Sequence, residues 1–121
     1  MTDCVIENNT SKDGGGGIYN HFNTASAGGF QLGLVMKNCK VQNNQTEGVG
    51  GGIWAHKSVK TKLYNTEVIA NEAGLEGGAI WAGEDLELYD TTITGNVSGG
   101  DGYALYMPEA NYDGHSNYTG F

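Results

Sequence analysis

Apolar and polar positions recur along the chain in a fixed frame that appears four times. Each copy reads Asp or Asn, Cys or Thr, any residue, Val or Ile, two free positions and then Asn. The copies span residues 3–9, 38–44, 65–71 and 90–96. Nine residues after each closing Asn stands an aliphatic residue, and an aromatic residue follows it. These pairs are Ile18–Tyr19, Ile53–Trp54, Ile80–Trp81 and Leu105–Tyr106. A repeat with a unit of about 25 residues predicts a solenoid or another repeat array.

Short runs within each unit alternate between apolar and polar residues with a period of two. In the second unit these runs cover residues 34–36, 39–41 and 53–55. A period of two is typical of strands, and the runs are too short for ordinary helices. Three short strands per unit predict an all-β parallel β-helix of about four coils over residues 1–106, followed by an irregular cap or tail over 107–121. The side chains expected inside the second coil are Leu34, Met36, Cys39, Val41, Ile53 and Ala55.

Asparagine and glycine are placed where a solenoid turns its corners. The first and last positions of each frame are expected at corners, because Asn, Asp and Gly tolerate left-handed backbone. The 21 glycines fit such a chain, and the single proline leaves strand N–H groups free to donate. We expect residues 10–17 to form a flexible corner and residues 20–31 a surface loop. The closing asparagines should stack as a structural ladder of side-chain amides, formed by Asn9, Asn44, Asn71 and Asn96.

Charge narrows the classes of partner. The chain has 14 acidic residues, six lysines and no arginine, which gives a formal net charge of −8. Such a surface repels phosphate backbones and disfavours anionic membranes, so we expect no nucleic-acid partner. No run of 18 apolar residues occurs, and we expect no membrane span in this chain. The first frame begins at Asp3 without a capping element before it, so we expect a fragment of a longer solenoid, or ends covered by partners.

The repeated phrases resemble those of a known family. The chain contains IENN, VQNN, VIAN and ITGN, together with GGGI twice, GGAI once and YALY in the fourth place. These resemble the Phe-x-x-Asn and Gly-Gly-Ala-Ile/Leu/Val repeats of the chlamydial polymorphic outer-membrane proteins, with an aliphatic residue in place of Phe. Similar repeats occur in large bacterial surface adhesins. Over residues 1–106, the resemblance implies a right-handed parallel β-helix in a secreted or surface-displayed protein, with a role in adhesion or scaffolding.

Two cysteines occupy the same frame position in neighbouring units. Cys4 and Cys39 are followed at that position by Thr66 and Thr91. Neighbouring strands lie about 4.8 Å apart, within the Cα separation that a disulfide allows. We favour two reduced thiols packed as small apolar residues, with a disulfide as the alternative.

The aromatic residues define the candidate binding surface. If the aliphatic partners point inward, alternation turns Tyr19, Trp54, Trp81 and Tyr106 outward as a strip of rings, one per coil. Exposed apolar strips usually mark binding surfaces, and flat rings suit sugars or a protein partner. Polar groups of the long loop, such as Asn20 and Asn23, would add hydrogen bonds. The alternatives are rings covered by a loop, or rings that belong to the core.

An enzyme is the principal rival. Pectin lyases and polygalacturonases use the same fold, but they rely on clustered Asp, on calcium with a basic residue, or on basic residues that hold uronates. This chain lacks Arg, and Asp3 and Asp90 stand at frame corners. His21, His56 and His115 have no indicated nucleophile nearby. We therefore expect no catalysis and no cofactor. Calcium is a weak alternative at Asp13, at Asp101, or at Glu84 with Asp85, which lack a full calcium-loop signature.

Together these patterns predict an extracellular or cell-surface protein without catalytic activity. It would scaffold or bind a glycan or a protein partner. The alternatives are a polysaccharide-active β-helix, or a purely structural solenoid that packs against neighbouring subunits of an assembly.

Overall fold

The protein is built from short parallel strands. The computed structural model describes residues 1–20, 34–55, 61–82, 86–100, 104–106 and 116–119. No helix occurs among these residues, and none therefore has the length and hydrophobicity of a membrane span. The strands are β1 (Val5–Glu7), β2 (Thr10–Ser11), β3 (Ile18–Asn20), β4 (Leu34–Lys37), β5 (Lys40–Gln42), β6 (Gln45–Thr46), β7 (Ile53–Ala55), β8 (Thr61–Tyr64), β9 (Glu67–Ile69), β10 (Glu72–Ala73), β11 (Ile80–Ala82), β12 (Leu86–Thr94), β13 (Val97–Ser98), β14 (Leu105–Tyr106) and β15 (Ser116–Thr119).

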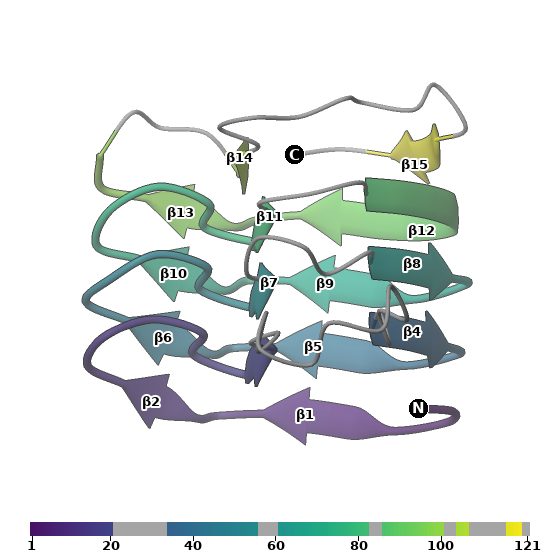
Figure 1. Cartoon of the computed structure of the whole chain (residues 1–121), viewed down its shortest axis with the longest axis horizontal. Helices are drawn as coiled ribbons and strands as arrows, with labels where there is room; N and C mark the ends of the chain where they lie inside the picture. The colour runs from purple at the N-terminus through teal and green to yellow at the C-terminus, as the bar shows by residue number, and fades with distance from the viewer. Residues whose placement is uncertain (21–33, 56–60, 83–85, 101–103, 107–115, 120–121) are drawn as a thin grey trace, which may run out of the picture.

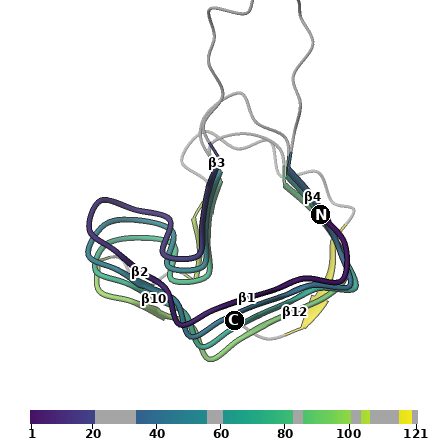
Figure 2. The same cartoon turned by 90° about the horizontal axis from the view of Figure 1, so that it is seen from below.

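Three parallel sheets run along the stack of coils, which is vertical in Figure 1. The first sheet has the order β1-β5-β9-β12-β8-β4, and β15 also pairs with β12. The second has the order β13-β10-β6-β2, and the third has the order β14-β11-β7-β3. Viewed along the stack, the coils follow nearly the same path (Figure 2). The predicted all-β parallel β-helix is confirmed, with four coils stacked in register.

The inside of the β-helix is filled by the alternating apolar positions. The six side chains expected inside the second coil are all buried, with exposed fractions between 0% and 8%. Their counterparts in the third and fourth coils, such as Leu63, Val68, Ile80 and Ile93, are fully buried as well. Burying one large aliphatic side chain contributes about 1.5–3 kcal/mol, so each coil adds a similar increment to the stack.

Left-handed residues occupy two positions of the frame in every coil, and Gly15, Gly50 and Gly77 add a third left-handed position with φ of 62–70°. The first position of each frame has positive φ, as expected, with values of 46–56° at Asp3, Asn38, Asn65 and Asp90. The second left-handed residue is not the closing Asn. It is the residue before it, with φ of 55–68° at Asn8, Asn43, Ala70 and Gly95. The closing Asn thereby turns its side chain into the coil.

The glycine-rich segment before the third sheet is packed rather than exposed. Gly14, Gly15 and Gly16 are buried, which corrects the expectation of a flexible corner over residues 10–17. A Cβ added to Gly51 would lie 2.3 Å from the carbonyl oxygen of Gly78 and 2.6 Å from the backbone carbon of Glu72. No side chain fits there, because the glycine backbone of one coil lies directly on the backbone of the next.

Two further differences concern strands. The second sheet is made of two-residue strands that the sequence pattern does not predict, while β4 and β5 both belong to the first sheet. Of residues 107–121, expected as a cap or tail, the structure describes 116–119, which form β15 parallel to β12. The chain there adds one more strand to the first sheet.

Candidate functional site

The candidate site is the outer face of the third sheet. Strand register places Tyr19 beside Trp54, Trp54 beside Trp81, and Trp81 beside Tyr106. Their aliphatic neighbours face the core, where Ile53 and Ile80 are fully buried. Because side chains alternate along a strand, the four rings lie on the outside. The sequence frame thus brings together all four predicted site residues.

The rings form a ladder in which most neighbours stack. The rings of Tyr19 and Trp54 have centroids 4.4 Å apart and planes inclined by 21°. Trp81 and Tyr106 are also stacked, at 6.2 Å and 29°, whereas Trp54 meets Trp81 edge-on at 82° and 6.0 Å. The rings therefore stand against one another, where a flat strip was expected.

The four rings are unequally exposed. Tyr19 is 50% exposed, while Trp54, Trp81 and Tyr106 are partly buried. Trp54 packs over the first coil: a Cβ added to Gly14 would lie 2.3 Å from its Cε3 atom. Trp54 therefore helps to fix the first coil, and Tyr19 is the ring with most surface to offer a partner. Of the loop residues expected to help, Asn20 ends β3, and Asn23 lies outside the described residues.

The closing asparagines form a second ladder inside the corner. The side-chain oxygen of Asn71 accepts hydrogen bonds from the backbone N and the Nδ2 of Asn44, both at 3.0 Å. Asn44 accepts the same pair from Asn9, and Asn96 from Asn71, at 2.8–3.1 Å. The Nδ2 groups of Asn44, Asn71 and Asn96 also donate to a strand carbonyl of the preceding coil, as from Asn71 to Val41 at 2.9 Å. These amides are satisfied within the corner, so their role is structural.

The ladder explains why the two halves of the repeated phrase occur together. A Cβ added to Gly52 would lie 3.0 Å from the Nδ2 of Asn71, and one added to Gly17 would lie 2.9 Å from the Nδ2 of Asn44. The glycine phrase of one coil thus packs against the asparagine of the next. Ala79 takes the corresponding place in the third coil and is fully buried.

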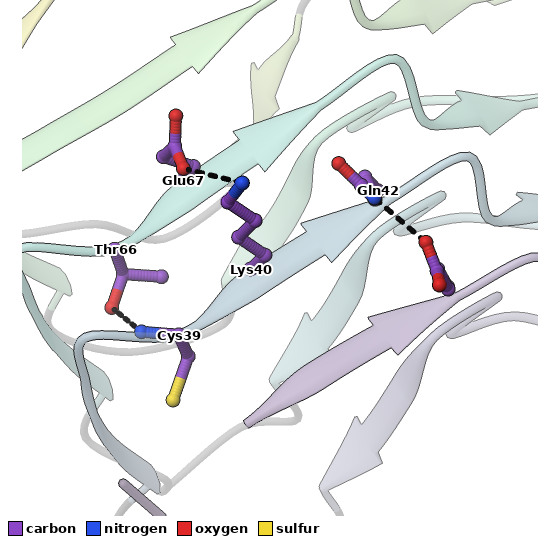
Figure 3. Close-up of polar contacts among 6 residues, drawn as sticks. Cys39, Lys40, Gln42, Thr66 and Glu67 are labelled. Carbon is purple, nitrogen blue, oxygen red and sulfur yellow. Dashed lines mark hydrogen bonds and ion pairs between the residues drawn. The ribbon is translucent and has the colours of Figure 1, made fainter. Parts of the chain in front are cut away.

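The frame position of the cysteines forms another inner column. The hydroxyl group of Thr91 donates to the carbonyl oxygens of Tyr89 at 3.0 Å and of Leu63 at 3.1 Å. The thiol of Cys39 donates to Lys37 O at 3.2 Å, and its backbone N donates to the Thr66 hydroxyl at 3.4 Å (Figure 3). Hydroxyl and thiol groups share this position because both can donate to the carbonyl two residues earlier. Both cysteines are free thiols in the structure.

Outside the core, charged and polar side chains pair from coil to coil. Lys40 lies 3.6 Å from Glu67, and Gln42 donates to Glu7 at 2.7 Å (Figure 3). Both members of the Lys40–Glu67 pair are substantially exposed, so this pair contributes little to stability.

Two surface features were missed or undervalued by sequence reasoning. Tyr64 and Tyr89 stack with centroids 4.8 Å apart, and the Lys37 ammonium lies 5.6 Å from the centroid of Tyr64. A separate open depression of about 670 Å³ crosses β2, β6 and β10. Thr10, Gln45, Glu47 and Glu72 are among its lining residues. The first feature was visible as tyrosines in register; the second depends on strands that the sequence did not reveal.

Most of the candidate metal-binding and catalytic residues lie outside the part of the chain that the structure describes. Glu84, Asp85, Asp101 and the three histidines lie outside the described residues. Within the described part of the chain, no three His, Cys, Asp or Glu side chains gather as metal ligands would. Asp3 and Asp90 are left-handed corner residues, with φ of 54° and 47°.

Comparison with known proteins identifies one similarity. Residues 3–21 match the family model of the Chlamydia polymorphic membrane protein repeat. Proteins of that family are located at the surface of the outer membrane, which supports a surface-associated protein at this coarse level. Neither a curated protein sequence nor a solved structure matches the chain. The resemblance first seen in IENN and GGGI is thus confirmed over one repeat.

Proposed function

We propose that this surface-associated β-helix is a non-catalytic binding scaffold that holds a partner along the aromatic ladder. The observation that carries the proposal is the register of four aromatic rings on the outside of the third sheet, one from each coil. The matched repeat, from a family of outer-membrane surface proteins, supports the proposal, because a surface location would leave such a face accessible to partners. Aromatic residues often dominate binding free energies at interfaces.

The ring geometry favours a protein partner over a glycan. Sugars bind best to the flat face of a ring, but the faces of Tyr19 and Trp54 pack against each other at 4.4 Å. Ring edges and a tyrosine hydroxyl suit apolar side chains and carbonyl groups of a protein surface. The mechanism we propose is insertion of such side chains along the rims of the ladder, with Tyr19 as the most exposed anchor.

The absence of catalysis is also part of the proposal. The chain has no arginine, and the two frame aspartates serve as corners with left-handed backbone. The corner conformation fixes the position of both residues, so neither could join a catalytic cluster unless the corner changed its backbone conformation. Incubation with polygalacturonate and with neutral polysaccharides should release no new reducing or unsaturated ends.

Binding is tested by removing the rings at the two ends of the ladder and, as a control, an exposed leucine outside it. We would label the protein with a fluorescent dye and measure its retention on cultured epithelial cells. The variant tested combines Tyr19→Ser with Tyr106→Ser. Leu75→Ser is the matched control, because Leu75 is 48% exposed against 50% for Tyr19 and lies outside the aromatic ladder. The tyrosine variant should lose about tenfold or more in apparent affinity, and the leucine variant should retain it.

Treatment of the cells with protease or with periodate distinguishes a protein partner from a glycan partner. Protease treatment should abolish retention if the partner is a protein, whereas periodate oxidation of surface glycans should leave it unchanged. Loss after periodate alone would identify a glycan instead. Equal retention by the wild type and the tyrosine variant would contradict binding through this face.

A further inference from the structure

Cys4 and Cys39 are stacked on neighbouring coils. The pairing of β1 with β5 sets Val5 beside Lys40, and therefore Cys4 beside Cys39. The Lys40 N–H donates to the Cys4 carbonyl at 2.9 Å, which fixes the two residues across a single coil step. Parallel neighbours stand about 4.8 Å apart, inside the Cα range of about 4.4–6.8 Å for a disulfide.

The sulfur of Cys39 is directed toward the first coil. It lies 3.2 Å from Lys37 O in its own coil and 3.7 Å from Met1 O in the first coil. Figure 3 shows this sulfur on the side of the residue away from Thr66, its neighbour in the third coil. The Cys4 thiol donates to Thr2 O at 3.2 Å, so both sulfurs occupy the same kind of inner position.

Access to the pair exists from one side. Cys4 is partly exposed, whereas Cys39 is only 2% exposed. An exchange reagent can therefore reach Cys4 first and leave Cys39 to complete the reaction. Among the described strands, β1 pairs with β5, so the disulfide would join the two coils that this pairing already holds side by side.

We infer that Cys4 and Cys39 form an intramolecular disulfide in an oxidising environment and so clamp the first coil to the second. The Cys4 thiolate attacks a low-molecular-weight disulfide such as oxidised glutathione, which releases one glutathione thiol and leaves a mixed disulfide. The Cys39 thiolate then attacks the Cys4 sulfur and releases the second. Two protein thiols are oxidised, one glutathione disulfide is reduced, and the two protons end on the released thiols.

The clamp acts on a coil whose core residues are less buried than those of the second coil. Ile6 and Ile18 of the first coil are partly exposed, whereas their counterparts Val41 and Ile53 are fully buried. Proteins at the cell surface meet oxidising conditions that preserve disulfides. Closing the loop from residue 4 to residue 39 should suppress separate opening of the first coil by about 100-fold or more.

The test uses purified protein with oxidised glutathione and two frame-compatible controls. Cys4→Thr and Cys39→Thr introduce the residue that Thr66 and Thr91 already provide at this position. The wild type should lose the mass of two hydrogen atoms, stay monomeric and retain no glutathione. Cys39→Thr should instead retain one glutathione on Cys4.

Hydrogen exchange gives the second readout. The amides of Asp3 and Asn8, which donate to carbonyls of the second coil, should exchange about 100-fold more slowly after oxidation. The double threonine variant should show no change with oxidant. A wild type that stays reduced, keeps glutathione on Cys4 or forms disulfide-linked dimers would overturn the inference, and so would unchanged exchange after the bond has formed.

Discussion

The asparagine ladder and the aromatic ladder are both columns with one residue per coil, yet they occupy opposite chemical environments. Asn44 and Asn71 are buried at 1% and 0% exposure, and every polar atom of their amides has a partner in the corner. Tyr19, in the outer column, is half exposed, and its ring stacks on that of Trp54. The same repeat therefore produces one column whose polar groups are all bonded within the fold and one column that lies on the outer surface. Stability should depend on the first, and binding on the second.

The largest effect is expected in the core beside the two ladders. Ile80→Asp places a charge at a fully buried position between coils, where no partner is available among the described residues. The loss of apolar burial and the cost of a lone buried charge together exceed the stability of a small domain. Circular dichroism should show an unfolded chain at room temperature. Val97→Asp, at a position that is 55% exposed, should melt as the wild type does; a cooperative native melt of Ile80→Asp would contradict the inward assignment.

A smaller but still large effect is expected from breaking the inner ladder. Asn71→Ala removes the acceptor of two buried Asn44 donors, at a cost of about 2–3 kcal/mol in urea unfolding. Asn9→Ala, at the exposed end of the ladder, should cost less than about 1 kcal/mol because water can replace its bonds. Equal losses for the two variants would show that the ladder is not what stabilises the corner.

A substitution of Trp54 tests how much the outer aromatic column contributes to the stability of the fold. Its ring packs over Gly14, so Trp54→Ala should lose about 1–2 kcal/mol of unfolding free energy. Tyr19→Ala is the comparison within the same column, and we expect it to lose less than Trp54→Ala, because the Tyr19 ring is half exposed and contributes mainly its stack on Trp54, at about 0.5–1 kcal/mol. If both changes cost the same, the outer column would be structural throughout.

The smallest effect is a gain. Ala70 has φ of 55° at the position where the other coils have Asn8, Asn43 and Gly95. Left-handed backbone disfavours alanine, so Ala70→Gly should raise the free energy of unfolding by about 0.5–1 kcal/mol. Ala73→Gly, a buried strand position nearby, should lower it. A loss of stability for Ala70→Gly would mean that this corner does not need the left-handed conformation.

Much of the fold could be predicted because spacing in a solenoid translates directly into stacking. The distance from Asn71 to Ile80 equals that from Asn44 to Ile53, so both residues of each pair stack in register. The strand Gln45–Thr46 was missed because two polar residues carry no alternation, and the neighbouring coils hold it through backbone hydrogen bonds. Ala70 concealed the second left-handed position, since alanine is not a turn residue.

The sequence predicted which residues form the candidate site, but not how their rings are oriented. Alternation places the rings of Tyr19 and Trp54 outside, but no sequence pattern states whether they lie flat or stack. Trp54 also packs against Gly14, a residue 40 positions earlier in the chain. Such contacts arise only after the coils have been stacked.

The most direct test of the account measures stability and binding on the same two variants. We would compare Asn71→Ala with Tyr19→Ser combined with Tyr106→Ser, using urea unfolding and cell retention at a temperature where both are folded. The account predicts that the asparagine variant loses about 2–3 kcal/mol of unfolding free energy and keeps its retention. The tyrosine variant should keep most of its stability and lose retention by about tenfold or more. A folded tyrosine variant with full retention, or one that loses as much stability as Asn71→Ala, would contradict the assignment of the outer ladder to binding.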